Sequence, residues 1–334
     1  MLLIGLYSFL ISFTVSILVI YISHKHNFFI DCEKSDKPQK FHEIPVPRAG
    51  GIGIMVALSL LFLTSYGVKL FIPALLAFLS GIFEDFHNSL SAKTRLIMQS
   101  VAALSAILFA NAVVTYLGLG IELPYIVGVV FSMFAIVGMI NAINIIDGFN
   151  GLASGIVILI LISLAVVTHN HNNKELLTAI IILLGATFGM FVLVFPKGKI
   201  FLGDGGAYLL GFLVGIFGIY LAGNYKDVSP WYILAIFIYP VWEVIFSIIR
   251  KLYMKKSPLK PDKYHIHMLI FRNITKSNPL TAIFILLWVS PFITVSTIYA
   301  NCSKCNIKIA LIFIVTYILL YLYLYNKEKK SAIS

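Results

Sequence analysis

Long apolar runs separated by short polar segments fill almost the whole chain. Eleven such runs are recognised, at 1–23, 50–66, 70–83, 94–116, 123–143, 152–168, 176–195, 207–222, 231–249, 280–300 and 307–325. A membrane-spanning helix needs about 20 apolar residues. The pattern therefore predicts an all-α, polytopic integral membrane protein with about 11 transmembrane helices, and ten is the alternative count. The short third run is expected to continue into its polar flanks.

Composition indicates the same class of protein. The 334 residues are 60% hydrophobic and only 12% charged, whereas charged residues make up about a quarter of a typical soluble protein. The first run has no basic segment before it and ends at His24-Lys25-His26 rather than at a small-residue cleavage site. It is therefore interpreted as the first membrane span and not as a cleaved signal peptide.

Lysines and arginines predict the orientation. If the N-terminus lies outside and the C-terminus lies in the cytoplasm, only five of the 25 lysines and arginines lie outside, namely Lys69, Lys174, Lys226, Lys304 and Lys308. Positive residues concentrate on the cytoplasmic side of membrane proteins, and this also explains most of the net charge of +11, so no nucleic-acid partner is predicted. The cytoplasmic loops of this single transmembrane domain are then about 24–49, 84–95, 144–151, 196–206 and 250–279.

Two cysteines lie on the predicted outer side. Cys302 and Cys305 fall in a short turn between the last two apolar runs. Three cysteines in the whole chain do not make a disulfide framework, so two free thiols are favoured over a disulfide between this pair. Neither alternative involves a metal.

Five acidic residues stand where an apolar run meets a polar loop: Glu84, Asp85, Asp147, Asp204 and Glu243. An ionised carboxylate near hydrocarbon costs about 2.5–3.5 kcal/mol, so such residues usually have a function. All five fall on the predicted cytoplasmic face. They are expected to form one acidic cluster that binds a divalent cation and a polyanionic ligand.

The cytoplasmic loops around these carboxylates are rich in groups that suit phosphate or metal, although each has a structural alternative. The candidates are Lys40, His42 and Arg48, then Lys93 and Arg95, then Asn144 and Asn150, and last Lys263, His265 and His267. Positive-inside charge, ion pairing and helix capping are the alternatives for the first three sets, and the His-x-His spacing taken alone favours neither a structural nor a functional role. Two histidines without a third His or Cys nearby do not make a closed zinc site, so contact with phosphate is favoured for His265 and His267.

Taken in order, these loops resemble those of a known family. The patterns Asn144-x-x-Asp147-Gly-x-x-Gly151-Leu-Ala and Phe201-x-Gly203-Asp204-x-Gly206 are similar to motifs of the polyprenyl-phosphate N-acetylhexosamine-1-phosphate transferases. This glycosyltransferase 4 family includes the undecaprenyl-phosphate GlcNAc-1-phosphate transferases and is related to the phospho-N-acetylmuramoyl-pentapeptide transferases. The chain departs from the family pattern at Glu84, Asn150 and Glu243, where the family has aspartate, and at Met268, where it has histidine.

The resemblance implies transfer of a HexNAc-1-phosphate from a UDP-sugar to polyprenyl (undecaprenyl) phosphate, with release of UMP. Such a reaction initiates a lipid-linked cell-surface glycan, for example O-antigen lipopolysaccharide or a cell-wall polymer. The implied location is the bacterial cytoplasmic (inner) membrane, with the active site on the cytoplasmic face, and a homodimer is the oligomer to consider. A transporter of a lipid-linked or nucleotide-linked sugar is the rival function, and an inactive scaffold homologue is another.

The resemblance also implies roles for the candidate residues. Mg²⁺ is the expected cofactor, with Mn²⁺ as the alternative, and Asp204 and Asp85 are its expected ligands. The expected catalytic residues are Glu84, Asp85, Asp147, Asp204, His265 and His267. The expected substrate-binding residues are Lys40, His42, Arg48, Lys93, Arg95, Asn144, Asn150 and Lys263.

Overall fold

Helices make up the regular secondary structure of the computed structural model, which describes residues 1–26, 28–29, 46–87, 90–257 and 263–331. In chain order they are α1 (Leu2–His26), α2 (Gly50–Ala57), η1 (Leu58–Leu63), α3 (Gly67–His87), α4 (Ala92–Ala110), α5 (Tyr125–Ile146), α6 (Leu152–Asn170), α7 (Lys174–Val194), α8 (Gly203–Asn224), α9 (Pro230–Ile236), α10 (Ile238–Tyr253), α11 (Ile266–Ile270), η2 (Phe271–Thr275), α12 (Asn278–Ile298) and α13 (Ser303–Ser331). The predicted all-α class is confirmed.

The apolar runs correspond to these helices, with two differences. Among the described residues, nine helices are long and apolar enough to cross a membrane, or ten if the bent pair α9 and α10 counts as one span. The run 50–66 forms only the shorter apolar helix Gly50–Leu63. The run 231–249 is not one straight helix, because α9 and α10 meet at 77°. Pro240 lies just after the bend, and its missing N–H cannot bond back to a carbonyl of α9.

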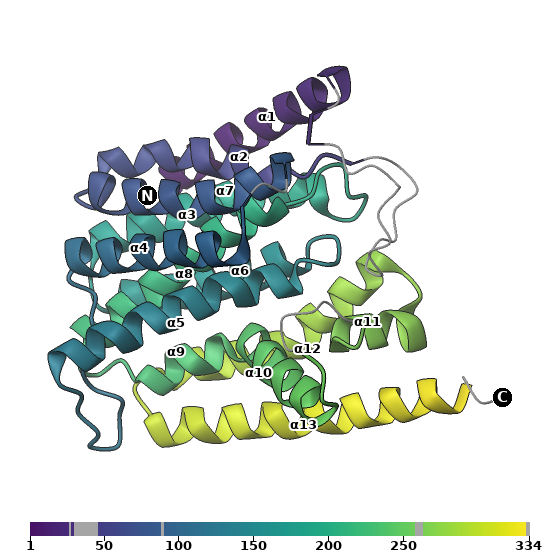
Figure 1. Ribbon diagram of the computed structural model, residues 1–334. Helices are drawn as coiled ribbons and strands as arrows, with labels where there is room; N and C mark the ends of the chain where they lie inside the picture. Colours follow the sequence, from purple (N-terminus) through teal and green to yellow (C-terminus); the bar gives the residue numbers. More distant parts are fainter. Residues whose placement is uncertain (27, 30–45, 88–89, 258–262, 332–334) are drawn as a thin grey trace.

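Helix α8 forms the centre of the bundle. In the apolar 18-residue stretch of α8, 94% of the residues are buried, whereas in the corresponding stretch of the peripheral helix α1 only 17% are buried. Helices α3 and α5 pack against α8 (Figure 1). A side chain at Gly51 of α2 would overlap the backbone of Gly206 in α8, and one at Gly81 of α3 would overlap the backbone of Asp204. These glycines therefore let the first turn of α8 lie directly against α2 and α3.

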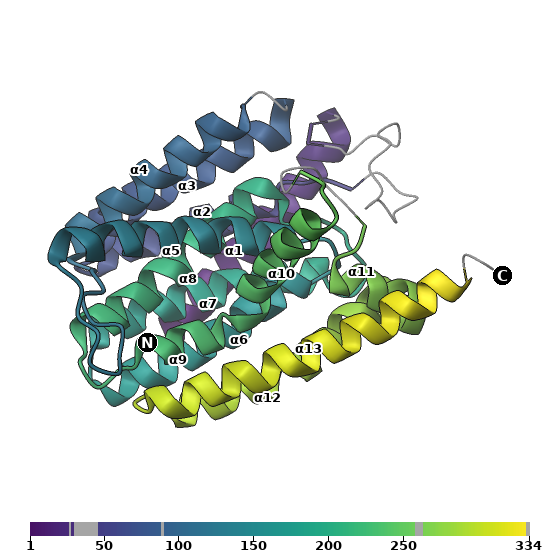
Figure 2. The same cartoon turned by 60° about the horizontal axis from the view of Figure 1, so that its bottom comes forward.

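One end of the bundle collects most of the predicted cytoplasmic segments. The ends of α1, α3, α5 and α7 and the beginnings of α4, α6, α8 and α12 lie together there, beside the C-terminal end of α13 (Figure 1). Helix α13 runs along α9 and α12, as both views show (Figures 1 and 2). The helices reach further than the predicted loop bounds, so Asp85 and Asp204 lie on helices and not in loops. Which side of a membrane this end faces stays a prediction.

The preference for two free thiols at Cys302 and Cys305 is wrong, because the structure joins them in a disulfide. Cys302 lies directly before α13 and Cys305 lies in its first turn, which brings their Cα atoms to 5.2 Å. This separation is within the range that a disulfide can bridge. The pair lies at the end of the bundle opposite to the collected loops (Figure 1).

Candidate active site

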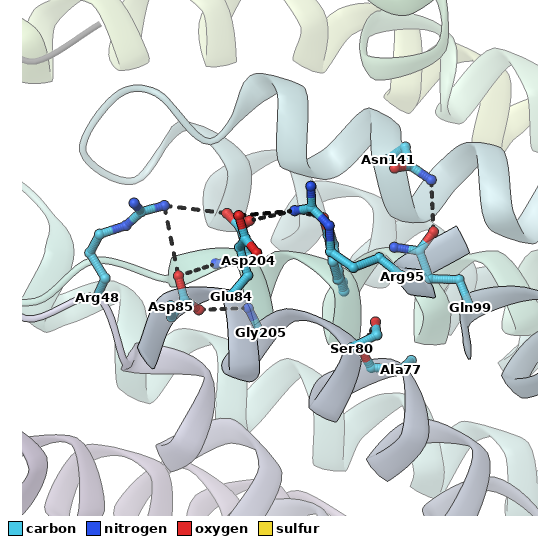
Figure 3. A network of polar contacts seen from close by, with 11 residues as sticks. Arg48, Ala77, Ser80, Glu84, Asp85, Arg95, Gln99, Asn141, Asp204 and Gly205 are labelled. Carbon is cyan, nitrogen blue, oxygen red and sulfur yellow. Dashed lines mark hydrogen bonds and ion pairs between the residues drawn. The ribbon is translucent and has the colours of Figure 1, made fainter. Parts of the chain in front are cut away.

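Asp204 lies between two arginines at the start of α8. Its Oδ1 is 3.3 Å from an Arg48 guanidinium nitrogen and its Oδ2 is 3.4 Å from one of Arg95, so the arginines approach from opposite sides (Figure 3). Gly203, with φ +74°, turns the chain into the helix in a conformation that favours glycine. Strong charge-assisted hydrogen bonds are about 2.7–2.9 Å long. The Asp204 carboxylate is therefore held loosely by its two partners.

Asp85, near the C-terminal end of α3, is held firmly. Its carboxylate oxygens accept hydrogen bonds from the backbone N–H groups of Asp204 (3.0 Å) and Gly205 (2.9 Å), as Figure 3 shows. The side chain is 1% exposed, and Arg48 lies 3.7 Å from Oδ1. The first N–H groups of a helix lack partners within that helix. Asp85 therefore caps α8 from a neighbouring helix and sets the position of Asp204.

Glu84 and Arg95 extend this cluster along α3 and α4. Arg95 lies 3.7 Å from Glu84 Oε1 and donates a hydrogen bond to the hydroxyl of Tyr208 at 3.2 Å. Ser91 caps α4 by accepting from the N–H of Thr94, which places Arg95 in the first turn. The other oxygen of Glu84, Oε2, is buried and has no hydrogen-bond partner among the described residues. Glu84 therefore offers an acceptor to a ligand.

Asp147 lies next to this cluster, directly after the C-terminal end of α5. Desolvation by the surrounding protein raises the pKa of the Asp147 carboxyl to about 7. Arg48 lowers this pKa, while the charges of Asp204 and Asp85 raise it. Asn144 lies one turn earlier on α5. Four of the five predicted carboxylates are thus brought together at this end of the bundle.

The fifth carboxylate, Glu243, does not join that cluster. It is 1% exposed and lies within α10. Its Oε1 is 2.9 Å from His265 Nδ1 and accepts the backbone N–H of Ile266 at 3.2 Å, while Oε2 accepts the hydroxyl of Tyr317 at 2.8 Å. The expectation of one cluster of five carboxylates is therefore wrong, because the bend before α10 turns Glu243 towards α11 and α13.

His267 lies between the two groups of residues. A Cβ atom at Gly148 would be 3.9 Å from its Nε2, and its ring centroid is 5.6 Å from that of Phe149. Burial lowers the pKa of His267 to about 3, against the effect of Glu243, so the ring stays neutral. The loop after Asp147 therefore contacts the histidine segment. Met268 is 2% exposed and packs in the core.

Asn150 joins three segments of the chain. Its backbone N–H donates to Asn278 Oδ1 at 2.7 Å, and its side-chain Nδ2 donates to the carbonyl of Pro196 at 3.0 Å. The described contacts thus give Asn150 a role in holding the loops 147–151 and 195–202 together. A carboxylate in its place could not donate to the Pro196 carbonyl.

The remaining candidates lie further out. The side chains of Lys93 and Lys263 are exposed. Lys40 and His42 lie outside the described residues. Tyr208, Tyr317 and Asn278 are contacts that the sequence analysis missed. The contact of Tyr208 could have been expected, because Asp204 and Tyr208 have i, i+4 spacing on one helix. Nothing in the sequence pattern indicates the contact of Tyr317.

A hard divalent cation fits the Asp204 cluster. Among the described residues, no group of three or more His, Cys, Asp and Glu side chains is arranged to hold a metal. Mg²⁺ needs only one or two carboxylates and takes its other ligands from water and phosphate. Asp204, with its loose contacts, and Glu84, with its buried Oε2 unpartnered, suit that role. The predicted ligand Asp85 suits it less, because both of its oxygens accept backbone N–H groups.

Comparison with known proteins gives consistent matches. The family model described as glycosyl transferase family 4 matches residues 68–222. The chain is 32% identical over 251 residues to the undecaprenyl-phosphate alpha-N-acetylglucosaminyl 1-phosphate transferase of Thermotoga maritima, covering 73% of this chain and 75% of that protein. It is 30% identical over 250 residues to a probable undecaprenyl-phosphate N-acetylglucosaminyl 1-phosphate transferase of Bacillus subtilis, covering 70% and 68% respectively. A phospho-N-acetylmuramoyl-pentapeptide-transferase of Streptococcus agalactiae is 28% identical over 184 residues, or 54% of this chain and 53% of that protein.

Proposed function

Because the chain belongs to glycosyl transferase family 4, we propose that it transfers an N-acetylhexosamine-1-phosphate to a polyprenyl phosphate. We propose a UDP-sugar as the donor, with UMP as the product that leaves. The names of the relatives from T. maritima and B. subtilis support N-acetylglucosamine as the sugar and undecaprenyl phosphate as the acceptor. The observation that carries the proposal is Asp204, placed at the start of α8 between Arg48 and Arg95.

The proposed reaction is a direct displacement. An oxygen of the lipid phosphate forms a bond to the sugar-bearing phosphorus, and the bond from that phosphorus to the oxygen bridging to UMP breaks. The leaving UMP keeps the bonding electron pair. A phosphate monoester has a second pKa of about 6, so the attacking oxygen is already ionised at neutral pH and needs no general base. Phosphoryl transfer mainly requires positioning and neutralisation of charge.

Each residue of the cluster has a part in this chemistry. Arg48 and Arg95 bind phosphate oxygens, for which the planar guanidinium is suited. Asp85 holds the first turn of α8 and so positions Asp204. Asp147 and Asn144 lie at the nucleotide-sugar, and His265 and His267 lie at the pyrophosphate.

We further propose that Asp204 and Glu84 hold Mg²⁺, or Mn²⁺ as the alternative. When bound, the cation neutralises negative charge on the phosphate groups. The unpartnered Oε2 of Glu84 supports this assignment, because a buried acceptor without a partner is costly unless a ligand uses it.

The membrane explains why the site lies at the end of the bundle. A lipid phosphate lies at the membrane surface and a nucleotide-sugar is soluble, so the two can meet only at that boundary. We propose that this end faces the cytoplasm in the bacterial inner membrane, in agreement with the distribution of lysine and arginine. The product would start a lipid-linked cell-surface glycan.

The contacts favour an enzyme over the two rivals. Transporter sites lie near the middle of the membrane, whereas Asp85, Asp147 and Asp204 lie at helix ends. An inactive scaffold was suggested by the departures from the family pattern. Those departures fall on residues with structural contacts in this chain, since Asn150 joins loops and Met268 packs in the core.

The test is UMP release by purified protein given undecaprenyl phosphate and a panel of UDP-N-acetylhexosamines, with Mg²⁺, Mn²⁺ or EDTA. We expect release with UDP-N-acetylglucosamine that EDTA abolishes and Mg²⁺ restores. No release with any donor from folded protein would rule out the proposed transfer. Release that is unaffected by EDTA would rule out the cation.

A further inference from the structure

The buried carboxylate of Glu243 is saturated with hydrogen bonds from other elements. His265 at the start of α11, the backbone N–H of Ile266 and the hydroxyl of Tyr317 on α13 all contact it at 2.8–3.2 Å. Glu243 and His265 are 1% and 6% exposed. A buried charge is costly unless every acceptor is paired, and these contacts supply that pairing. Glu243 and Tyr317 lie outside the Asp204 cluster, and the proposed displacement gives neither of them a role.

We propose that Glu243 and Tyr317 are positioning residues for His265, which hold its ring with the Nδ1 proton directed at Glu243 and present Nε2, once it is protonated, as a hydrogen-bond donor to a phosphate oxygen of the substrate. The identity of the ligand rests on the proposed function. The position of the proton rests on the hydrogen bonds alone.

The donors around Glu243 determine where that proton lies. Tyr317 donates to Oε2 and the N–H of Ile266 donates to Oε1. A carboxylate that accepts at both oxygens has no proton to give, so the short contact at 2.9 Å requires His265 Nδ1 to be the donor. In a neutral ring Nε2 is then the unprotonated nitrogen. When Nε2 takes up a proton, the Glu243 carboxylate offsets the positive charge of the ring.

The second histidine of the segment has different surroundings. The rings of His265 and His267 are parallel, with an interplanar angle of 1° and centroids 5.3 Å apart. The Nδ1 of His267, however, lies 3.4 Å from the hydroxyl of Tyr239, a neutral partner. Within the described part of the chain, only His265 of this pair therefore has a direct carboxylate partner. The two histidines, alike in sequence, are assigned different roles.

Tyr317 links the C-terminal helix to this arrangement. Its ring packs edge-on against Phe246 at 5.1 Å and against Trp242 at 6.4 Å. These contacts from α10 fix the direction of the hydroxyl, so the position of α13 affects His265 through Glu243. A residue of the last helix, far from the family motifs in sequence, is thereby connected to the site.

The first readout is nitrogen NMR of the full-length protein in lipid, labelled with ¹⁵N-histidine and without substrate. The His265 signals are assigned by their loss in His265→Asn. We expect a protonated Nδ1 in the wild type and a mixture of tautomers in Glu243→Gln, in which one carboxylate oxygen is replaced by an amide. A wild-type signal with the proton on Nε2 and none on Nδ1 would overturn the proposal.

The second readout is kinetic and uses matched tyrosine variants. Tyr317→Phe removes only the hydroxyl, and Tyr321→Phe, one turn further along the same stack of rings, keeps the Glu243 contact. We expect Tyr317→Phe and Glu243→Gln to lower kcat/KM for UDP-N-acetylglucosamine by about 10- to 100-fold, by analogy with the cost of losing a group that orients a metal-bound histidine. Tyr321→Phe should stay within about twofold of wild type, and Glu243→Asp should recover much of the loss because it retains a carboxylate.

The two readouts separate this proposal from the proposed function. Wild-type protein that releases no UMP but has the Nδ1 proton contradicts the transfer and supports the positioning network. Equal effects of Tyr317→Phe and Tyr321→Phe on both the spectrum and the kinetics would overturn the role of Tyr317. Thermal unfolding of each variant identifies those whose losses come from misfolding.

Discussion

The two polar networks of this protein differ in how completely their groups are paired. In the Asp204 cluster the ion-pair distances are 3.3–3.7 Å, and one oxygen of Glu84 has no partner among the described residues. In the Glu243 network the carboxylate accepts three hydrogen bonds of 2.8–3.2 Å and is almost completely buried. The first arrangement leaves room for a charged ligand, whereas the second is complete without one.

This difference indicates a division of function between the two networks. The residues of the first network contact a ligand, and those of the second position a residue that contacts it. A group that must bind a cation or a phosphate cannot already be saturated by the protein. A group that must hold a histidine in one tautomer has to be saturated, because each unpaired acceptor would permit another orientation. The same residue type, a carboxylate at a helix near the membrane boundary, therefore serves two purposes.

The strongest test of this division is to neutralise one carboxylate in each network. Asp204→Asn is expected to lower transfer by about 1,000-fold, the upper range for a lost electrostatic contact in an active site, with little loss of stability because its contacts are loose. Glu243→Ala is expected to lower the unfolding temperature as well, since it leaves buried partners unpaired. UMP release and thermal unfolding would be measured on both proteins.

The control is Asp227→Asn at the opposite end of the bundle. Asp227 is 70% exposed and pairs with His171 at 2.9 Å. The transfer activity of this variant should stay within about twofold of wild type, since exposed ion pairs contribute little to stability. If Asp204→Asn destabilised the protein as much as Glu243→Ala, the contrast between the two networks would be wrong.

Asp147→Asn tests the charge state of the site and should lower transfer by about 100-fold. The pKa of Asp147 is raised to about 7, whereas an unfolded aspartate has a pKa of about 3.9. A raised pKa means that stability is lost as pH increases from the unfolded pKa through the folded pKa. Asparagine does not ionise, so the variant does not lose stability in this way. The variant should therefore be more stable than wild type at about pH 8, and this difference in stability should be much smaller at about pH 4.

Thermal unfolding without divalent cations at the two pH values would check this prediction. Cations are omitted because a bound cation would also favour the ionised carboxylate. An unfolding-temperature difference between variant and wild type that does not depend on pH would show that folding does not raise the pKa of Asp147.

Arg95→Lys tests whether geometry or charge matters in the loose cluster. The guanidinium lies near Asp204, Glu84 and Tyr208 at 3.2–3.7 Å, which a lysine ammonium cannot reproduce. We expect the rate of transfer to fall by about 10- to 100-fold, which is the effect expected from losing one hydrogen bond to a charged group. Tyr208→Phe, which removes one of these contacts, should have a smaller effect. Wild-type kinetics in Arg95→Lys would show that only the positive charge is needed.

The smallest effect is expected from restoring the family's aspartate at position 150. Asn150→Asp puts a carboxylate against the carbonyl of Pro196 and should lower stability by about 1–3 kcal/mol, with transfer reduced by less than about tenfold. Asn224→Asp is the matched control, because Asn224 also donates to backbone carbonyls but is exposed at the other end of the bundle. A rise in transfer in Asn150→Asp would show that Asn150 limits catalysis.

The sequence predicted the helical class and, within its expected cluster of five carboxylates, the collection of Glu84, Asp85, Asp147 and Asp204. These predictions succeeded because hydrophobic periodicity and the alternation of helices and loops follow from the local order of residues. The sequence failed where pairing across helices decides the outcome. Nothing in the pattern shows that Asp85 accepts from the backbone of α8, or that Asn150 donates to Pro196.

The sequence by itself determined which segments are helices and which carboxylates lie at their ends, because both follow from the local alternation of apolar and polar residues. The tertiary structure alone decided how each carboxylate is paired. The bend between α9 and α10 carried Glu243 away from the acidic cluster to His265 and Tyr317, and the close approach at Gly81 placed Asp85 on the start of α8. Pairing depends on contacts between residues up to 156 positions apart, and no local pattern specifies such contacts.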